Sequence, residues 1–342
     1  MSFRNDEKQR YRSILSRLFT PNGAQMLGTY MGKQRDFCLP DSCSRENLHQ
    51  SVCTLAIDYF HNRRIAWHDG LDDAAGNKKA LPSNHVCCSQ SACVNSLAPM
   101  MLDPDLLAQV FRLFLPELRE VLPFDDDNPL PSNQKPYLAF EWIGKPGSNY
   151  LGEVGNRQRR ANATSADFAF RFRRYDGRIQ LVLGEWKYTE EYLGRRLPLP
   201  GQVNRTQLRV YKRAFDRWCS CEPSLPPYES FFVEPFYQLM RLTLLAQEME
   251  EAGKAGDGEM GATVVSVVHI APAANRDFVE GFTSPVFRSL GREVTSAWAQ
   301  IAPPHRFQPI RTESLLTAIE EVAMHKYPMW ADWLLTRYGW WR

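Results

Sequence analysis

Thr164-Ser165-Ala166-Asp167 opens the stretch that decides the fold, which continues through Tyr175-Asp176-Gly177 to Leu181-Val182-Leu183-Gly184-Glu185-Trp186-Lys187-Tyr188-Thr189-Glu190. The residues between the first motif and the turn alternate as in a β-strand, and a second apolar segment follows the turn. Side chains two residues apart lie on the same face of a strand, so Glu185 and Lys187 share one face. The stretch predicts a β-hairpin with an acid at the start of one strand and Glu-x-Lys at the end of the next.

The length of the turn decides whether Asp167 joins that face. A three-residue loop at 175–177 places Asp167 opposite Glu185 when the residues are counted back along both strands. Directly opposed residues on antiparallel strands share a face. A two-residue loop would instead oppose Asp167 to Trp186 and send the two acids to opposite faces. We predict the three-residue loop, because such loops commonly end in a residue with positive φ and Gly177 suits that position.

Both faces of the predicted hairpin carry apolar residues. One face should hold Asp167, Ala169, Leu183, Glu185 and Lys187, and the other Phe168, Phe170, Phe172, Val182 and Trp186. Strands that are apolar on both sides are typical of a sheet inside an α/β domain. Charged groups in such a place are costly unless a metal ion or partners compensate them. An ion pair of Lys187 with either acid would also satisfy these charges, but the paired acids and their matching register favour a functional site.

The overall charge does not indicate a nucleic-acid partner, but the local charge does. The 342 residues include 41 Lys and Arg against 39 Asp and Glu, a formal net charge of +2. Basic residues nevertheless crowd around the acidic hairpin: Arg157, Arg159, Arg160, Arg171, Arg173, Arg174, Arg178, Arg195, Arg196, Arg205, Arg209, Lys212 and Arg213. A basic rim around paired acids suits a polyanionic substrate held over a metal ion. For any single arginine, a solvated charged surface is an equally good interpretation.

Nothing in the sequence indicates a membrane or an oxidising compartment. The N-terminal residues lack an apolar signal segment, and no run reaches the roughly 18–20 apolar residues of a membrane span. We therefore expect a cytoplasmic protein whose eight cysteines are free thiols or metal ligands rather than disulfides. The two equally spaced pairs Cys38/Cys43 and Cys88/Cys93 are candidates for structural zinc. Burial as free core thiols is the favoured interpretation.

Helices and strands outside the hairpin follow from hydrophobic periodicity. Helices are expected over 1–20, 46–64, 89–101, 104–121, 203–218 and 233–252, and strands over 137–143, 166–174, 178–188 and 263–270. Helices should fill much of the remainder. This gives an α/β fold with a central mixed sheet in α-β-β-β-α-β order. We expect a mainly helical region at 1–102, a core at 103–285, and a helical, Trp-rich extension at 286–342 that anchors against the core or a second subunit.

Asp167 lies at the start of one expected strand, and Glu185-Trp186-Lys187 lies at the end of the next. Together with the expected order of elements, these residues resemble the PD-(D/E)xK superfamily of nucleases, whose core is the restriction-endonuclease-like fold. A bacterial family of restriction endonucleases looks closer still. Its resemblance rests on 164–167 with 185–190, on Ile65-Ala66-Trp67-His68, and on Asn84-His85-x-x-x-Ser89-Gln90-x-x-Cys93-x-Asn95. It covers roughly residues 45–215. Ala166 stands where the motif has proline, at a position that the superfamily keeps loosely.

The resemblance implies a metal-dependent nuclease that hydrolyses phosphodiester bonds in DNA, in restriction, defence or repair. Asp167 and Glu185 would bind Mg²⁺, or Mn²⁺, with the backbone carbonyl of Trp186 completing the shell. Lys187 would orient the attacking water and offset charge on the phosphate. Such sites often use an additional acid, for which the candidates are Glu117, Glu120, Glu141 and Glu153. Glu153 is favoured because it leads into the basic segment before the hairpin.

The same resemblance suggests substrate contacts and leaves alternatives open. Arg157, Arg159 and Arg160 would contact phosphates. Gln207 and Tyr211 resemble the Gln-x-x-x-Tyr signature of RecB-like nucleases and share a helix face at i and i+4, although core packing explains Tyr211 equally well. The first alternative function is a non-catalytic nucleic-acid-binding protein that retains the fold. The second is a zinc-binding scaffold built around the cysteines. A homo-oligomer is compatible with the sequence.

Overall fold

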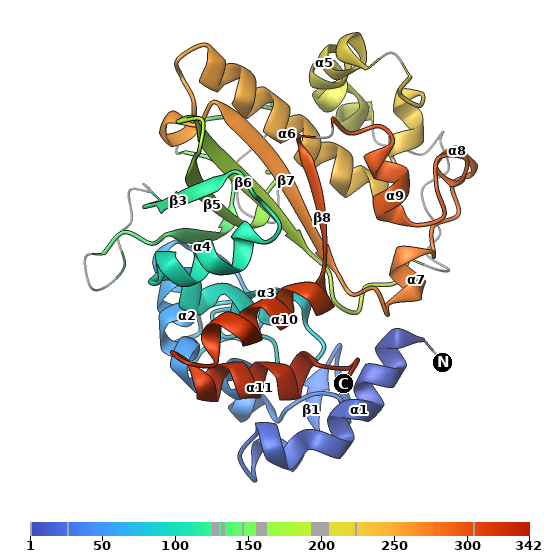
Figure 1. The fold of residues 1–342 in the computed structure, drawn as a ribbon. Helices are drawn as coiled ribbons and strands as arrows, with labels where there is room; N and C mark the ends of the chain where they lie inside the picture. The colour runs from blue at the N-terminus through green and yellow to red at the C-terminus, as the bar shows by residue number, and fades with distance from the viewer. Residues whose placement is uncertain are drawn as a thin grey trace.

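A single mixed sheet forms the centre of the molecule, with helices packed on both of its faces (Figure 1). The computed structural model describes residues 2–25, 27–124, 130, 134–145, 147–154, 163–192, 205–222, 224–303 and 305–342, and only the backbone of 205–207. On one face lies α6 (Phe236–Lys254), which packs on β7. On the other face α4 (Pro104–Arg112) packs its Phe111 ring against Phe168 and Phe170 of β5. The expected α/β class is confirmed.

Six strands make up this sheet. They are β3 (Leu118–Leu122), β4 (Leu138–Trp142), β5 (Ala166–Arg174), β6 (Ile179–Trp186), β7 (Val264–Ala271) and β8 (Phe307–Arg311). Their order is β3-β5-β6-β7-β8, and β4 also pairs with β5. Strand β5 runs antiparallel to β3, β4 and β6, whereas β7 is parallel to both β6 and β8. This mixed sheet is consistent with a restriction-endonuclease-like fold.

The turn between β5 and β6 has three residues, as predicted. The backbone N–H of Arg174 donates to the carbonyl of Arg178 at 2.9 Å, and the N–H of Gly177 donates to the carbonyl of Arg174 at 3.1 Å. Gly177 has a φ of +86°, which is readily accessible only to glycine. The turn therefore sets the register of the whole hairpin.

The remaining elements surround the sheet. The longer helices are α1 (Phe3–Leu18), α2 (Gln50–Asn62), α3 (Ser89–Leu97), α5 (Arg205–Cys221), α10 (Thr312–Ala323) and α11 (Pro328–Tyr338), and the shorter ones are α7 (Arg276–Val279), α8 (Pro285–Arg288) and α9 (Val294–Ala299). A small hairpin of β1 (Gly28–Tyr30) and β2 (Lys33–Arg35) stands apart from the sheet. Helix α4 begins as predicted, since Pro104 occupies its first position and Asp103 accepts a hydrogen bond from the N–H of Leu106 at 3.1 Å.

One expectation about these elements is wrong, and two elements were not predicted. The helix predicted to run to Val121 ends at Arg112, because Pro116 cannot continue it. The residues that follow form β3 instead. Neither strand β8, which lies among the C-terminal helices, nor the β1–β2 hairpin was predicted. Both β3 and β8 are edge strands whose pairing depends on a distant partner rather than on a local pattern.

One hydrophobic core contains residues from both ends of the chain. It includes Phe3 and Tyr11 of α1, strand residues of the sheet, and Trp330 and Tyr338 of α11. The Trp330 indole N–H donates to the carbonyl of Asn95 at 2.8 Å, so the Trp-rich extension anchors against the core as expected. The division into three regions stays a prediction.

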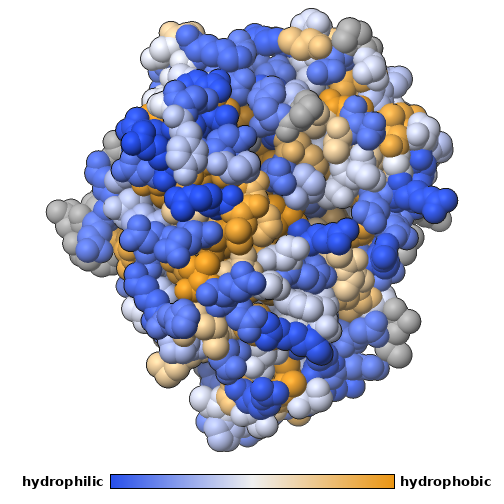
Figure 2. Space-filling view, in the orientation of Figure 1, coloured by the Kyte–Doolittle hydropathy of each residue, from blue (hydrophilic) through white to orange (hydrophobic). Residues whose placement is uncertain are grey.

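The surface in Figure 2 is mostly hydrophilic, with an apolar area near the centre of the face shown. Within the ranges that the structure describes, we find no helix with the length and apolar character that a bilayer crossing requires.

Candidate active site

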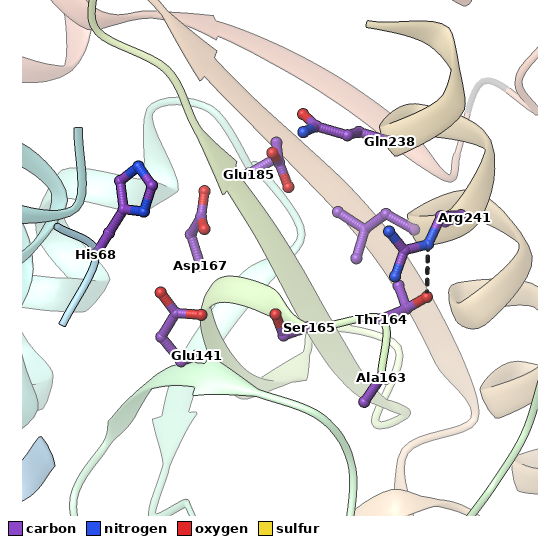
Figure 3. A pocket seen from close by; sticks show the side chains of 10 residues that line it. His68, Glu141, Ala163, Thr164, Ser165, Asp167, Glu185, Gln238 and Arg241 are labelled. Atoms are coloured by element: carbon purple, nitrogen blue, oxygen red, sulfur yellow. Dashed lines mark hydrogen bonds between the residues drawn. The ribbon is translucent and has the colours of Figure 1, made fainter. Parts of the chain in front are cut away.

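The central hairpin brings Asp167 and Glu185 onto one face of the sheet. Strands β5 and β6 pair Phe168 with Gly184, so Asp167 lies opposite Glu185 one position further along. An Asp167 carboxylate oxygen (Oδ2) accepts a hydrogen bond of 2.8 Å from the backbone N–H of Trp186. The register predicted from the sequence is confirmed, and both acids line one pocket (Figure 3).

Glu141 extends this pair to a row of three acids on three neighbouring strands. Strand β4 keeps one register with β5 on both sides of Glu141, which places Glu141 opposite Asp167. Its side chain is buried, and its φ of +47° lies in the left-handed region that side-chain-bearing residues rarely adopt. Gln90 Nε2 donates to Glu141 Oε1 at 2.6 Å. A strained backbone and a buried charge at one position are typical of functional sites.

Lys187 is the ammonium group of this site. Its Nζ lies 2.6 Å from Glu185 Oε1 and 2.6 Å from Gln238 Oε1. The side chains of Lys187 and Glu185 are only 8% and 12% exposed. Burial disfavours the charged ammonium, but Glu185, followed by Tyr192 and Glu190, holds the pKa of Lys187 well above its usual value. Lys187 is therefore protonated at neutral pH.

The surroundings of Asp167 disfavour its charged form, in contrast to those of Lys187. Burial, together with the negative charges of Glu185 and Glu141, raises the pKa of Asp167 well above its usual value. The ammonium of Lys187 and the N–H of Trp186 oppose this rise without cancelling it. Three carboxylates facing one ammonium leave an excess of negative charge, which a bound divalent cation would neutralise.

The acids line an open pocket between the sheet and α6, with a volume of about 330 Å³. Gln238 and Arg241 reach it from one face of α6, and His68 reaches it from the segment after α2 (Figure 3). Arg241 Nε donates to Thr164 Oγ1 at 3.1 Å, and its side chain is 25% exposed. The pocket thus has acids on the sheet and a guanidinium on the facing helix.

Glu153, the favoured additional acid, lies in a different hydrogen-bond cluster. It accepts hydrogen bonds from the N–H of Thr164 at 2.9 Å and from the Thr164 hydroxyl at 2.6 Å. The hydroxyl of Tyr211 donates to it at 3.1 Å, and Arg241 Nη2 lies 3.7 Å away. Glu153 therefore braces the segment before β5, and Glu141 is the acid beside Asp167. Only the pairing of β4 with β5 distinguishes these two candidates, and that pairing is not legible in the local sequence.

The other predicted site residues have mixed placements. Tyr211 is buried on α5 and contacts Glu153, whereas the side chain of Gln207 is outside the described residues. Trp186 contributes its backbone N–H to Asp167, and its ring is buried. The predicted phosphate contacts Arg157, Arg159 and Arg160 also lie outside the described residues. Substrate binding by these residues stays a prediction.

None of the eight cysteines forms a disulfide with another in the structure. Cys38, Cys88 and Cys93 are buried, and Cys43 is half-buried. Among the described residues, no three His, Cys, Asp or Glu side chains stand close enough to hold a metal ion as they are now oriented. A zinc site at the cysteines stays a prediction. At the acidic row, Glu185 faces Lys187 and Glu141 faces Gln90, so cation binding would require a carboxylate to turn.

Sequence reasoning singled out His68 only through the Ile65-Ala66-Trp67-His68 resemblance, and it assigned no role to Gln238 or Arg241. Gln238 and Arg241 are three residues apart on a helix that is otherwise largely apolar. Polar side chains at that spacing form a stripe on one helix face. This polar stripe could have indicated that Gln238 and Arg241 face a polar site, although it does not indicate which strand the helix packs against.

The model of a family described as Restriction Endonuclease associating with ARP matches residues 12–339. The match includes the acidic row, the pocket, the last part of α1 and all of α11. It confirms the resemblance to a family of restriction-endonuclease-like proteins that the motifs indicated. No curated protein and no solved structure matches the chain.

Proposed function

The chain belongs to the family described as restriction endonuclease associating with ARP, and on this basis we propose that it is a metal-dependent nuclease that hydrolyses phosphodiester bonds in DNA. Family membership supports a nuclease-type role. The observation that carries the finer proposal is the row of Glu141, Asp167 and Glu185 with Lys187 beside it, on the wall of an open pocket. Its biological setting would be restriction, another defence role, or repair.

The donor set of the acidic row fits a hard divalent cation. Asp167 and Glu185 offer carboxylate oxygens, which Mg²⁺ and Mn²⁺ prefer, and the backbone carbonyl of Trp186 belongs to the same strand end. Glu141 would be the additional acid in place of Glu153. The raised pKa of Asp167, which burial causes first and the negative charges of Glu185 and Glu141 increase further, supports this assignment. Bound Mg²⁺ would polarise the scissile phosphate and acidify a water molecule.

The protein's own residues would position the reacting groups. Lys187, protonated and buried, would orient the attacking water and offset the charge that develops on the phosphate oxygens. Arg241 would hold a phosphate oxygen from the facing helix, since its guanidinium lines the same pocket. Water attacks phosphorus in line, the bond from phosphorus to the leaving oxygen breaks, and that oxygen takes up a proton. No covalent enzyme intermediate is formed.

Plasmid cleavage tests the proposal. Supercoiled DNA is incubated with Mg²⁺ or Mn²⁺ and the wild type, Asp167→Ala, Glu185→Ala or Lys187→Ala. Each variant should lose activity by about 100-fold or more, as removal of a group that stabilises a transition state does. Glu251→Ala and Lys254→Ala, at exposed positions of α6, serve as matched controls and should cleave normally.

Two other results would redirect the assignment. DNA binding without cleavage, across several metals and DNA forms, would refute hydrolysis and support a non-catalytic DNA-binding protein. Stoichiometric zinc by elemental analysis, with no DNA affinity at low salt, would support a scaffold built around the cysteines.

A further inference from the structure

His68 lines the acidic pocket and has a carboxylate beside it. Figure 3 shows its imidazole on the other side of Asp167 and Glu185 from Arg241. The Nε2 atom of His68 lies 3.6 Å from Asp69 Oδ2, within ion-pair range, and the two side chains are 57% and 36% exposed. A histidine that is paired with an acid and exposed in a pocket can meet a bound substrate.

Two consecutive hydrogen bonds tie the backbone of His68 to the acidic row. The N–H of His68 donates to Gln90 Oε1 at 2.7 Å, and Gln90 Nε2 donates to Glu141 Oε1 at 2.6 Å. Gln90 is buried, so its amide bridges the segment after α2 to strand β4. His68 cannot move away from the row without leaving a buried polar group unpaired, which is costly.

Asp69 is itself held from a distant part of the chain. The hydroxyl of Tyr30 donates to Asp69 Oδ2 at 3.0 Å, and this is the oxygen that faces His68. Tyr30 belongs to the small β1–β2 hairpin, and its ring packs edge-to-face against Phe37 and His85. Asp69 has a φ of +48°, a conformation that is uncommon outside glycine and is often found at functional sites. Tyr30 therefore fixes Asp69, and Asp69 in turn orients the imidazole, as carboxylates do for catalytic histidines.

The charged groups around His68 among the described residues are mostly acids. Asp69 lies on its own segment, and the acids of the sheet are Glu141, Asp167 and Glu185. The cations are Arg241, on the facing helix, and Lys187, which Glu185 already holds. Only the imidazolium form of His68 is attracted by these acids, so the charged form fits this position. Such a group can give a proton to a substrate atom in the pocket.

We propose that His68 is the general acid of the reaction, and that Asp69 and Tyr30 are positioning residues that act through it. Water attacks phosphorus and gives up its own proton to solvent. The bond from phosphorus to the leaving oxygen breaks, the electron pair stays on that oxygen, and the oxygen takes the proton of His68 Nδ1, because Asp69 faces Nε2. The neutral imidazole then regains a proton from solvent. The inference rests on the proposed function, since it names the source of the proton that the leaving oxygen takes up.

A bridging phosphorothiolate tests this proton transfer separately from substrate binding. Sulfur replaces the leaving oxygen at a position that the wild type cleaves, identified from the ends of its products, and both substrates are cleaved with Mn²⁺. A thiolate leaves without a proton, so the sulfur substrate needs no general acid. His68→Gln should lower the single-turnover rate on ordinary DNA by about 100-fold or more, and should leave the rate on the sulfur substrate nearly unchanged.

Asp69→Asn should show the same pattern with a loss of about tenfold or more on ordinary DNA, because the imidazole loses the charge that orients it. Tyr30→Phe should show it with a smaller loss. Each variant's two rates are compared with each other, so a fraction of misfolded protein lowers both and cancels. His61→Gln, at an exposed histidine near the end of α2, is the matched control and should cleave both substrates as the wild type does.

The outcomes separate this inference from the proposed function. An equal loss on both substrates in His68→Gln would overturn the inference, since His68 would then bind phosphate or shape the pocket. Wild-type rates in His68→Gln on ordinary DNA would also overturn it and would leave the proposed function intact. If the wild type cleaves neither substrate with any divalent cation, the proposed function and the inference fail together.

Discussion

Replacing Asp167 by asparagine should make the protein more stable while abolishing its activity. The pKa of Asp167 is raised by burial and by the charges of Glu185 and Glu141, so its ionised form is unfavourable in the folded protein. Asparagine has nearly the same shape, and its carbonyl oxygen can keep the hydrogen bond to the N–H of Trp186. A site that holds unneutralised charge for function commonly gains stability when that charge is removed.

The size of this gain follows from the neighbours of Asp167. Opposed side chains on adjacent strands stand about 5 Å apart, where two like charges repel by about 3 kcal/mol at an effective dielectric constant near 20. Two acids repel Asp167 and Lys187 offsets one of them. Weakening the hydrogen bond from Trp186 costs about 1 kcal/mol, because a neutral acceptor replaces a charged one. A net gain of about 2 kcal/mol is expected at neutral pH.

Urea denaturation of wild type and Asp167→Asn at several pH values measures the gain. A carboxyl whose pKa is raised by folding binds protons more tightly in the folded state, so wild-type stability falls as pH rises from the unfolded value, 3.8, through the raised folded value. The advantage of asparagine should therefore be small near pH 4 and should increase toward pH 8. Added Mg²⁺ should stabilise the wild type more than the variant.

Asp103→Asn is a control of opposite sign. Burial disfavours the charged form of Asp103, but Lys326 and the N–H of Leu106 hold its pKa below the usual value. Its contribution is present above the unfolded pKa and is lost as pH falls through the folded one, so asparagine should destabilise the protein at pH 8. A loss of stability in Asp167→Asn at pH 8, comparable to that of Asp103→Asn, would refute the reasoning. Asp167 would then belong to an ordinary structural ion pair.

Three further predictions concern the same hairpin and its neighbour. Lys187→Met should lower the free energy of unfolding by about 3–5 kcal/mol at pH 8, because Glu185 is left charged and buried. In urea denaturation, the Glu185→Gln, Lys187→Met double variant should recover most of this loss. If it recovers none, Lys187 and Glu185 do not form a stabilising pair. Glu141→Gln should reduce plasmid cleavage by about tenfold or more while the fold is retained by circular dichroism, whereas wild-type kinetics would exclude Glu141 from the site. Gly177→Ala should cost about 1 kcal/mol in thermal unfolding, because φ is +86° in open space; an unchanged midpoint would show that the turn does not need glycine.

The hairpin was predictable because its determinants are close together in the chain. Alternation with a period of two, a glycine suited to positive φ, and a loop of three residues are enough to place Asp167 opposite Glu185. Counting along two connected strands requires no knowledge of the rest of the fold. The same locality explains why the start of α4 and the buried strand β7 were also expected correctly.

The rest of the site depends on pairings between distant segments. The sequence offers both Glu141 and Glu153 as the additional acid and favoured Glu153, and only the register of β4 against β5 places Glu141 in the row. Gln238 and Arg241 lie about fifty residues after the hairpin and reach the pocket because α6 packs on the sheet. Edge strands β3 and β8 similarly owe their existence to the partner beside them.

The sequence by itself determined which side chains share a face, because covalent geometry and the turn control neighbours along one hairpin. Only the tertiary structure decided which acid joins Asp167 and Glu185, and which helix side chains face Lys187. Those choices are made by packing and strand pairing over long separations, where many arrangements satisfy the same local pattern and burial selects among them.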